Sequence, residues 1–171
     1  MRKKSLLLTL VGGLLGLSAW AQPFQTTTVG TDGFAAGTSW YTMRIGNSQK
    51  YLTDNGTASS MTLKASSQYE DADLWCFTGN DANGYAIYNK QAGAGKVLAS
   101  ATTMTTKPGY GGTGGTTYPT LQAANALPAG YVGTWDLATS NKVADVDGYF
   151  VKIHGTSYAM NDFAGLGTLA F

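Results

Sequence analysis

One aromatic phrase occurs twice in this 171-residue chain, and its recurrence constrains the fold more than any other feature. The first copy places Trp75-Cys-Phe in a short apolar run, which is followed by a polar turn at 79–84 and the alternating Tyr85-Ala-Ile-Tyr. That pattern predicts a strand, a tight turn and a second strand. The second copy begins at Trp135 and continues in Tyr149-Phe-Val-Lys-Ile. A repeated phrase of this kind predicts a fold built from similar units.

Three units align along the chain, and each is expected to contain several short strands. The first strand of each unit is predicted from an alternating apolar pair: Met43 and Ile45, Tyr85 and Ile87, Val151 and Ile153. The second and third elements are expected at 50–52 and 61–65, at 96–98 and 120–124, and at 158–160 and 168–171. The tryptophans supply a fourth element in units one and two, where we expect both rings to be buried. Unit three has no fourth element before Phe171, so we expect it to be truncated at the C-terminus. A missing strand would leave an unpaired edge, so the full gene product is expected to continue.

Helix signals are weak. The sequence contains 23 glycines, and residues 22 onward have no 12-residue stretch with apolar residues at helical spacing. We therefore expect an all-β domain over residues 39–171. The preceding residues 22–38 are rich in Thr and Gly and are interpreted as a lead-in. Residues 101–130 are interpreted as a Gly/Thr-rich loop insertion. Their glycine run lacks the Gly-Lys-Ser/Thr ending of a phosphate-binding loop.

The N-terminus has the pattern of a secretory signal peptide. A basic Arg2-Lys-Lys head precedes an uncharged apolar stretch at 5–17, and Ala19-Trp-Ala21 fits a cleavage site. A membrane anchor is the alternative, but this apolar stretch is too short to cross a hydrocarbon core of roughly 30 Å as a helix. We expect cleavage after Ala21, no membrane span after signal removal, and a secreted or periplasmic protein.

Charge and residue counts exclude several function classes. Removal of residues 1–21 takes away three of the 11 basic side chains and none of the 10 acidic ones, which leaves a net charge of −2. Nothing in that balance favours nucleic acid as a partner. Cys76 is the single cysteine and His154 the single histidine, so we expect no disulfide, no His/Cys metal site and no cofactor. We expect Cys76 to be a small buried hydrophobe.

Acidic residues do not form an evident catalytic pair. Asp145-Val-Asp-Gly matches part of a calcium loop, but the downstream glutamate of such a loop is absent. Glu70, Asp71 and Asp73 are interpreted as one solvated turn. Glycoside cleavage needs two carboxylates across a cleft, and no such pair is evident. We therefore expect no catalytic residue in this chain.

The units resemble the β-trefoil of ricin-B-type lectins, over residues from Trp40 to the end. The lectin phrase Gly-Lys-x-Leu is matched by Gly95-Lys-Val-Leu98. The lectin phrase Gln-x-Trp appears as Asp73-Leu-Trp75 and Gly133-Thr-Trp135, without the glutamine. The chain is similar to trefoil-like modules at the N-terminus of secreted bacterial glycoside hydrolases, sialidases among them. The resemblance implies a β-trefoil of three four-strand units that binds carbohydrate.

The resemblance also suggests where sugar would bind. In such lectins an acidic or amide side chain follows the Lys-x-Leu strand, and an aromatic ring stacks on the sugar. Carried to this chain, those roles fall on Asp54 and Asn55 in unit one, and on Asn161, Asp162 and Phe163 in unit three. Unit two offers only Ala99-Ser100 and is expected to be silent. Turn formation is the alternative at Asp54-Asn55-Gly, because Asn and Gly tolerate positive φ.

Three hypotheses for function follow. The first is a non-catalytic carbohydrate-binding module whose partner is a glycan or polysaccharide, and which holds an attached enzyme near that glycan. The second is a structural or protein-interaction spacer without sugar binding. The third places hydrolysis in a catalytic domain C-terminal to this segment, as in a glycoside hydrolase or sialidase.

Overall fold

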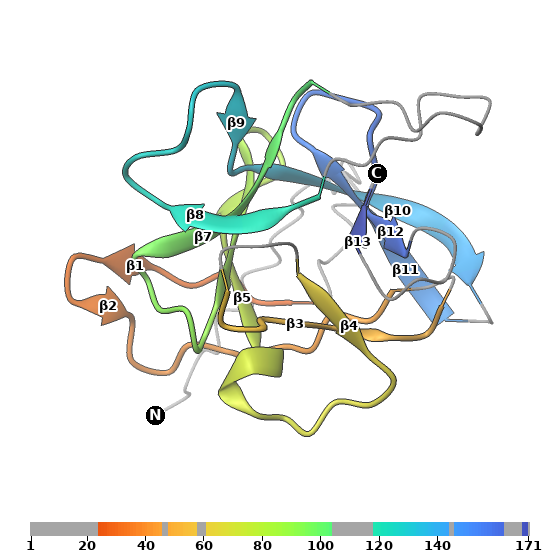
Figure 1. Ribbon diagram of the computed structural model, residues 1–171, viewed down its shortest axis with the longest axis horizontal. Helices are drawn as coiled ribbons and strands as arrows, with labels where there is room; N and C mark the ends of the chain where they lie inside the picture. The colour runs from red at the N-terminus through yellow and green to blue at the C-terminus, as the bar shows by residue number, and fades with distance from the viewer. Residues whose placement is uncertain are drawn as a thin grey trace, which may run out of the picture.

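The computed structural model describes residues 24–45, 48–57, 61–103, 118–143, 146–162 and 169–170, and these residues form an all-β fold (Figure 1). A single 3-10 turn, η1 (Asp71–Asp73), is the helical element among them. All pairings between the strands are antiparallel. In chain order the strands are β1 (Val29–Gly30), β2 (Gly33–Phe34), β3 (Tyr51–Thr53), β4 (Thr62–Lys64), β5 (Trp75–Asn80), β6 (Gly84–Asn89), β7 (Lys96–Ala101), β8 (Thr120–Ala123), β9 (Tyr131–Val132), β10 (Trp135–Val143), β11 (Val146–Ile153), β12 (Asn161–Asp162) and β13 (Leu169–Ala170).

The two copies of the aromatic phrase form the central sheet, whose strand order is β11-β10-β6-β5. Strands β5 and β6 pair from Trp75↔Asn89 to Asn80↔Gly84, as the strand–turn–strand pattern predicts. The Asn80 side chain accepts hydrogen bonds from the backbone N–H groups of Ala82 and Asn83, at 3.0 and 3.1 Å, and closes the turn. The prediction of two strands around this turn is confirmed.

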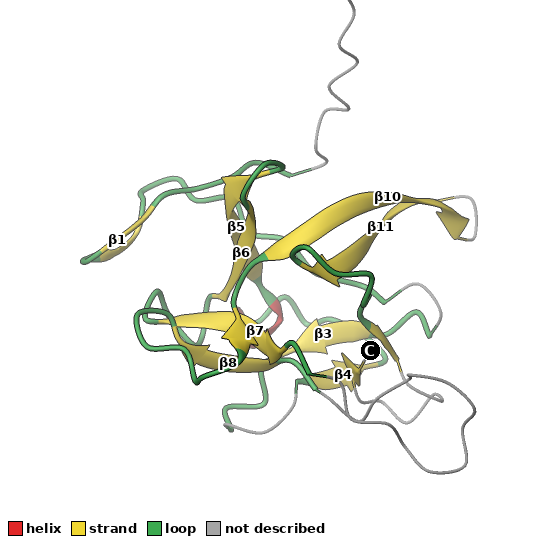
Figure 2. Ribbon diagram, turned by 90° about the horizontal axis from the view of Figure 1, so that it is seen from above, coloured by secondary structure: helices red, strands yellow, loops and turns green. Residues whose placement is uncertain are grey.

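Small hairpins form a second layer, which Figure 2 shows on the opposite side of the fold from β10 and β11. Strand β3 pairs with β4, and β7 pairs with β8. A further hairpin, β12–β13, belongs to the third unit. In units one and two these strands overlap the predicted second and third elements. In unit three β13 lies within the predicted 168–171, whereas β12 begins one residue after the predicted 158–160. Strand β9, which pairs with the end of β7, was not predicted. Strand β8 lies within the 101–130 segment, of which residues 104–117 are outside the described residues.

Hydrogen bonds repeat between units and correct the predicted alignment. Tyr41 pairs with Trp75 in unit one, and Tyr85 pairs with Trp135 in unit two. The equivalent of Tyr85 is therefore Tyr41, two residues before the predicted Met43. Units one and three match closely, because the N–H of Leu52 donates to the Met43 carbonyl as the N–H of Met160 donates to the Val151 carbonyl. Their N···O distances are 2.8 and 2.9 Å.

Both repeated tryptophans are core residues, as predicted. Trp75 and Trp135 have no exposed surface. The Trp75 indole N–H donates to the Leu52 carbonyl at 3.0 Å, and that of Trp135 donates to the Leu98 carbonyl at 2.9 Å. Each ring therefore joins the central sheet to the hairpin of its own unit. A buried indole needs such an acceptor, because an unpaired buried N–H would cost stability.

Cys76 is buried beside Trp75, as expected for a small hydrophobe. Burial raises the pKa of its thiol to about 12. Because the thiolate is the reactive form of cysteine, this group is inert in the folded protein.

The lead-in contributes to the fold from Phe24 onward. The Phe24 ring stacks on Phe77 with ring centroids 4.3 Å apart, and Thr26 forms a parallel bridge with the same residue. The β1–β2 hairpin follows. Residues 1–23, which include the predicted signal peptide, lie outside the described residues. In the described part of the chain, no helix has the length and apolar character needed to cross a membrane.

Candidate functional site

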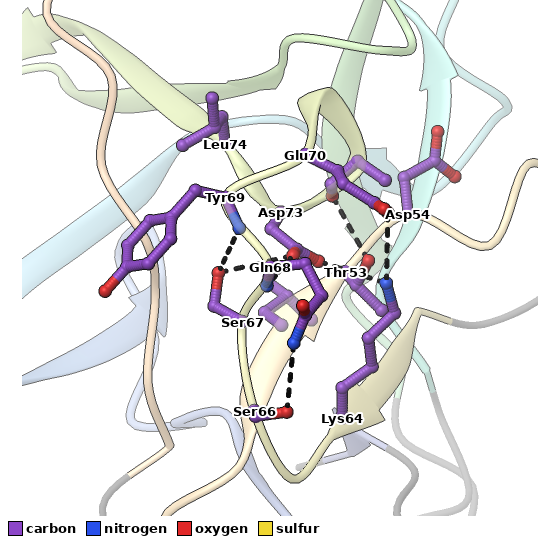
Figure 3. Close-up of polar contacts among 12 residues, drawn as sticks. Thr53, Asp54, Lys64, Ser66, Ser67, Gln68, Tyr69, Glu70, Asp73 and Leu74 are labelled. Carbon is purple, nitrogen blue, oxygen red and sulfur yellow. Dashed lines mark hydrogen bonds and ion pairs between the residues drawn. The ribbon is translucent and has the colours of Figure 1, made fainter.

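The connection between β4 and η1, residues 65–70, presents an aromatic ring to solvent, and we name it the Tyr69 loop. It belongs to unit one, between the β3–β4 hairpin and the tryptophan strand β5. Its sequence, Ala-Ser-Ser-Gln-Tyr-Glu, has no apolar periodicity, so propensity alone assigns it no regular structure. Its conformation comes instead from a buried carboxylate on η1 (Figure 3).

That carboxylate is Asp73, which has no exposed surface. One of its oxygens accepts hydrogen bonds from the Gln68 N–H at 2.9 Å and from the Ser67 hydroxyl at 3.2 Å. The other oxygen is 3.3 Å from Lys64 Nζ. Burial raises the pKa of Asp73, but hydrogen bonds from Thr53, Gln68 and Lys64 together lower it below its usual range. The prediction of a solvated turn is therefore wrong for Asp73, because this residue is buried. Its carboxylate remains charged because it accepts several hydrogen bonds.

Tyr69 is the exposed residue of the loop. It is 74 % exposed, more than the other exposed aromatic residues Phe150 and Tyr118, and its φ is +58°. A left-handed backbone is uncommon for a bulky residue and costs about 1–2 kcal/mol. The Tyr69 N–H donates to the Ser67 hydroxyl oxygen at 3.1 Å, and that hydroxyl is itself fixed by Asp73. In Figure 3 the Tyr69 ring points away from this cluster.

Charged side chains of both signs lie on neighbouring positions. Lys64 approaches Glu70 at 4.0 Å, on the side of the cluster away from the Tyr69 ring (Figure 3). The Asp71 carboxylate is 2.7 Å from Lys90 Nζ, and the same ammonium lies 5.7 Å from the centre of the Trp40 ring. Hydrogen-bond donors and acceptors therefore flank the Tyr69 loop, with Lys64 and Glu70 on the side away from the ring.

The predicted residues Asp54 and Asn55 follow β3 directly. Asp54 is only 7 % exposed. One of its oxygens accepts a hydrogen bond from the Gly56 N–H at 2.9 Å, and the other accepts one from Gln91 Nε2 at 3.3 Å. Asn55 is exposed, and its side-chain oxygen accepts from the N–H and the hydroxyl of Thr57 at 2.9 and 2.8 Å. In both cases a side-chain oxygen accepts from the N–H two residues later, which is the contact that turn formation at Asp54-Asn55 predicts. In Figure 3 Asp54 and Tyr69 point in opposite directions, so the structure does not bring them to one face.

The predicted residues of unit three can be placed only by their backbone. Asn161 and Asp162 form β12 and pair with Ala170 and Leu169. Their side chains lie outside the described part of the structure, as does the whole of Phe163. In unit two the equivalent position is occupied by Ala99 and Ser100, which are completely buried in β7.

Sequence reasoning missed an acid–histidine pair between β10 and β11. The Asp136 carboxylate lies 2.6 Å from His154 Nδ1 and accepts a second hydrogen bond from the Gly155 N–H at 3.0 Å. Burial raises the pKa of Asp136, but these hydrogen bonds lower it below its usual range. Asp136 lies on β10 and His154 directly follows β11, so the pair depends on the register of these two strands, which spacing in the sequence does not give. Tyr69 was also missed, although an aromatic residue within a polar run is a recognisable sign of exposure.

No family model, curated protein or solved structure matches this chain. The function must therefore be inferred from the chemistry of its surface. Among the described residues, no three His, Cys, Asp or Glu side chains gather closely enough to hold a metal ion. What unit one presents is an exposed aromatic ring on a fixed loop, and such a ring can stack on an apolar ligand face.

Proposed function

We propose that this chain is an exported, non-catalytic carbohydrate-binding module with a β-trefoil fold. The repeated connections support the fold. Each of the three units contributes a small hairpin, and in units one and two a buried indole N–H donates to the Leu carbonyl in the first strand of that hairpin. Units one and three share their strand-to-hairpin hydrogen bonds. Three such units around a common core are the plan of a β-trefoil.

The observation that carries the binding function is Tyr69. Tyr69 is 74 % exposed and has a left-handed backbone, and residues in such strained conformations cluster at ligand-binding and active sites. The buried Asp73 holds the loop in place, so a ligand meets a prepared ring and little ordering entropy is lost on binding. Sugars offer an apolar C–H face to such a ring, and their hydroxyls pair with neighbouring amide and carboxylate groups.

Further contacts are proposed at the residues that the lectin resemblance implies. These are Asp54 and Asn55 in unit one, and Asn161, Asp162 and Phe163 in unit three. The partner is a glycan or polysaccharide. A catalytic domain joined to such a module would gain from the raised local glycan concentration.

A glycan array with the purified protein tests this proposal. We expect binding to a defined set of glycans, and we expect Tyr69→Ala to weaken it about tenfold, which corresponds to the loss of one stacking contact. Tyr118→Ala is the matched control, because Tyr118 is also an exposed tyrosine but is 36 % exposed and lies outside the Tyr69 loop. Asp162→Ala tests unit three in the same way. Unchanged affinity in a folded Tyr69→Ala variant would remove Tyr69 from the site.

A structural or protein-interaction spacer is the second candidate. The observation that favours it is Asp54, whose two carboxylate oxygens both accept hydrogen bonds within the chain. A folded protein that binds no glycan on the array would favour this spacer function.

A further inference from the structure

A hollow of about 250 Å³ lies between residues 25–28 and residues 35–39, at the base of the β1–β2 hairpin. Its walls carry hydroxyl groups, one amide and small apolar groups, and no charged side chain. The lining includes Gln25, Thr27, Ala35, Thr38 and Ser39. It is separate from the Tyr69 loop and from every residue that the proposed function uses.

The two walls are fixed to the core. The Gln25 N–H donates to the Tyr41 hydroxyl at 2.7 Å, and the Thr27 N–H donates to the Phe77 carbonyl at 2.8 Å. The Ala35 N–H donates to the Thr28 carbonyl at 3.0 Å and joins one wall to the other. The hollow is therefore formed before any ligand arrives, which lowers the entropy lost on binding.

Hydrogen-bond directions in the hollow follow from counting protons. The Thr38 hydroxyl donates its one proton to the Ala35 carbonyl at 2.7 Å. The Thr27 hydroxyl, 2.7 Å from that of Thr38, must then be the donor of their shared bond. The lone pairs of the Thr27 hydroxyl oxygen are therefore available to accept from a ligand. The Ser39 hydroxyl donates to Gln25 Oε1 at 3.1 Å, so its oxygen can also accept.

Gln25 supplies the complementary donors. Its carbonyl oxygen is used by Ser39, whereas its Nε2 group carries two hydrogens that no described residue accepts. Donors and acceptors therefore alternate around an uncharged hollow. A phosphate or carboxylate would find no cation here, and a cationic ligand would find no carboxylate. At about 250 Å³ the hollow lies just below the usual size of ligand pockets, which suits a single small ring.

From this arrangement we propose that the hollow binds a small neutral polyol, such as a single sugar ring, through Gln25, Thr27 and Ser39. This binding is independent of the Tyr69 loop and goes beyond the proposed function. Bound there, a polyol hydroxyl accepts from Gln25 Nε2 and neighbouring hydroxyls donate to the oxygens of Thr27 and Ser39.

An NMR titration of the purified protein with methyl glucoside and with myo-inositol tests the proposal, and inorganic phosphate serves as a charged comparison. We expect the neutral probes to shift the backbone amides of Thr27 and Thr38, and phosphate to leave them unchanged. Gln25→Glu keeps the acceptor for Ser39 and the side-chain shape but removes both donors, so we expect at least about fivefold weaker binding. Gln122→Glu, on β8, carries the same charge change and should bind as the unaltered protein does.

Two results would overturn the proposal. One is a folded protein whose amides at 25–39 do not move with either neutral probe. The other is a Gln25→Glu variant that binds both probes with unchanged affinity. Tyr69→Ala separates this site from the proposed function, because the pocket should keep its affinity in that variant even if glycan binding at the loop is lost.

Discussion

Replacing Tyr69 with glycine and with alanine gives a sharp test of the strained loop. Both variants lose the same ring, so their difference isolates the backbone. Alanine retains the left-handed cost of about 1–2 kcal/mol at a φ of +58°, whereas glycine does not. Glycine loses about 0.5–1 kcal/mol more backbone entropy on folding. We therefore expect Tyr69→Gly to be more stable than Tyr69→Ala by about 0.5–1 kcal/mol.

Urea unfolding followed by tryptophan fluorescence measures this difference. Ala124→Gly provides the control, because Ala124 is exposed and is not among the residues with positive φ. There glycine should destabilise the protein by about 0.5–1 kcal/mol relative to alanine. The stability difference between glycine and alanine should therefore have opposite signs at residues 69 and 124. A Tyr69→Gly variant that is less stable than Tyr69→Ala would refute the reasoning, since residue 69 would then have no left-handed strain to relieve.

Two further predictions concern buried polar groups. Asp73→Asn should lower the free energy of unfolding at pH 7 by about 2–3 kcal/mol. The neutral amide replaces the charged acceptor of the Gln68 N–H, the Ser67 hydroxyl and Lys64, and at least one of these donors loses its acceptor. Because the folded pKa of Asp73 lies below its ordinary 3.8, its stabilisation is present above that value and is lost as pH falls through the folded pKa. Urea titrations between pH 2 and 5 should therefore show a shallower pH dependence in the variant, and an identical slope would contradict the assignment. Trp135→Phe should cost about 2–4 kcal/mol in the same assay, because it removes the donor to the Leu98 carbonyl and leaves a cavity. Trp40 is half-buried, so Trp40→Phe should lower the free energy of unfolding by less. Equal losses in the two variants would contradict the role of the buried Trp135 indole.

The repeated aromatic phrase was enough to predict the central sheet and both buried tryptophans. Alternation and turn composition act locally, and here they agree with the tertiary structure. The alignment of the units was two residues off in unit two, because Asn89 takes the inward position that Ile45 and Ile153 occupy in the other units. A polar residue at a core position hides the repeat from hydrophobic patterning. Its amide is satisfied by the Ala72 and Leu74 carbonyls, at 2.9 and 3.2 Å.

The candidate site was harder to predict, because it depends on contacts that sequence spacing does not show. Asp73 looks like any other acid of a polar turn until its donors are placed around it. Asp54 was selected for its position after a strand, and the structure shows its oxygens engaged within the chain. Tyr69 carries no motif, since exposure and a left-handed backbone are tertiary outcomes. The β1–β2 hollow is likewise made by two short segments held in place by Tyr41 and Phe77.

The burial of Cys76 makes its thiol a probe for opening of the central sheet. The thiol is buried on β5, the edge strand of the central sheet, next to Trp75 and opposite Tyr88. An external thiol reagent can meet it only when β5 separates from its neighbours, and the chain has no second cysteine to complicate the signal. The labelling rate therefore counts openings of the sheet directly. It distinguishes motions that expose the core from movements confined to the surface loops, in a single experiment and without any substitution.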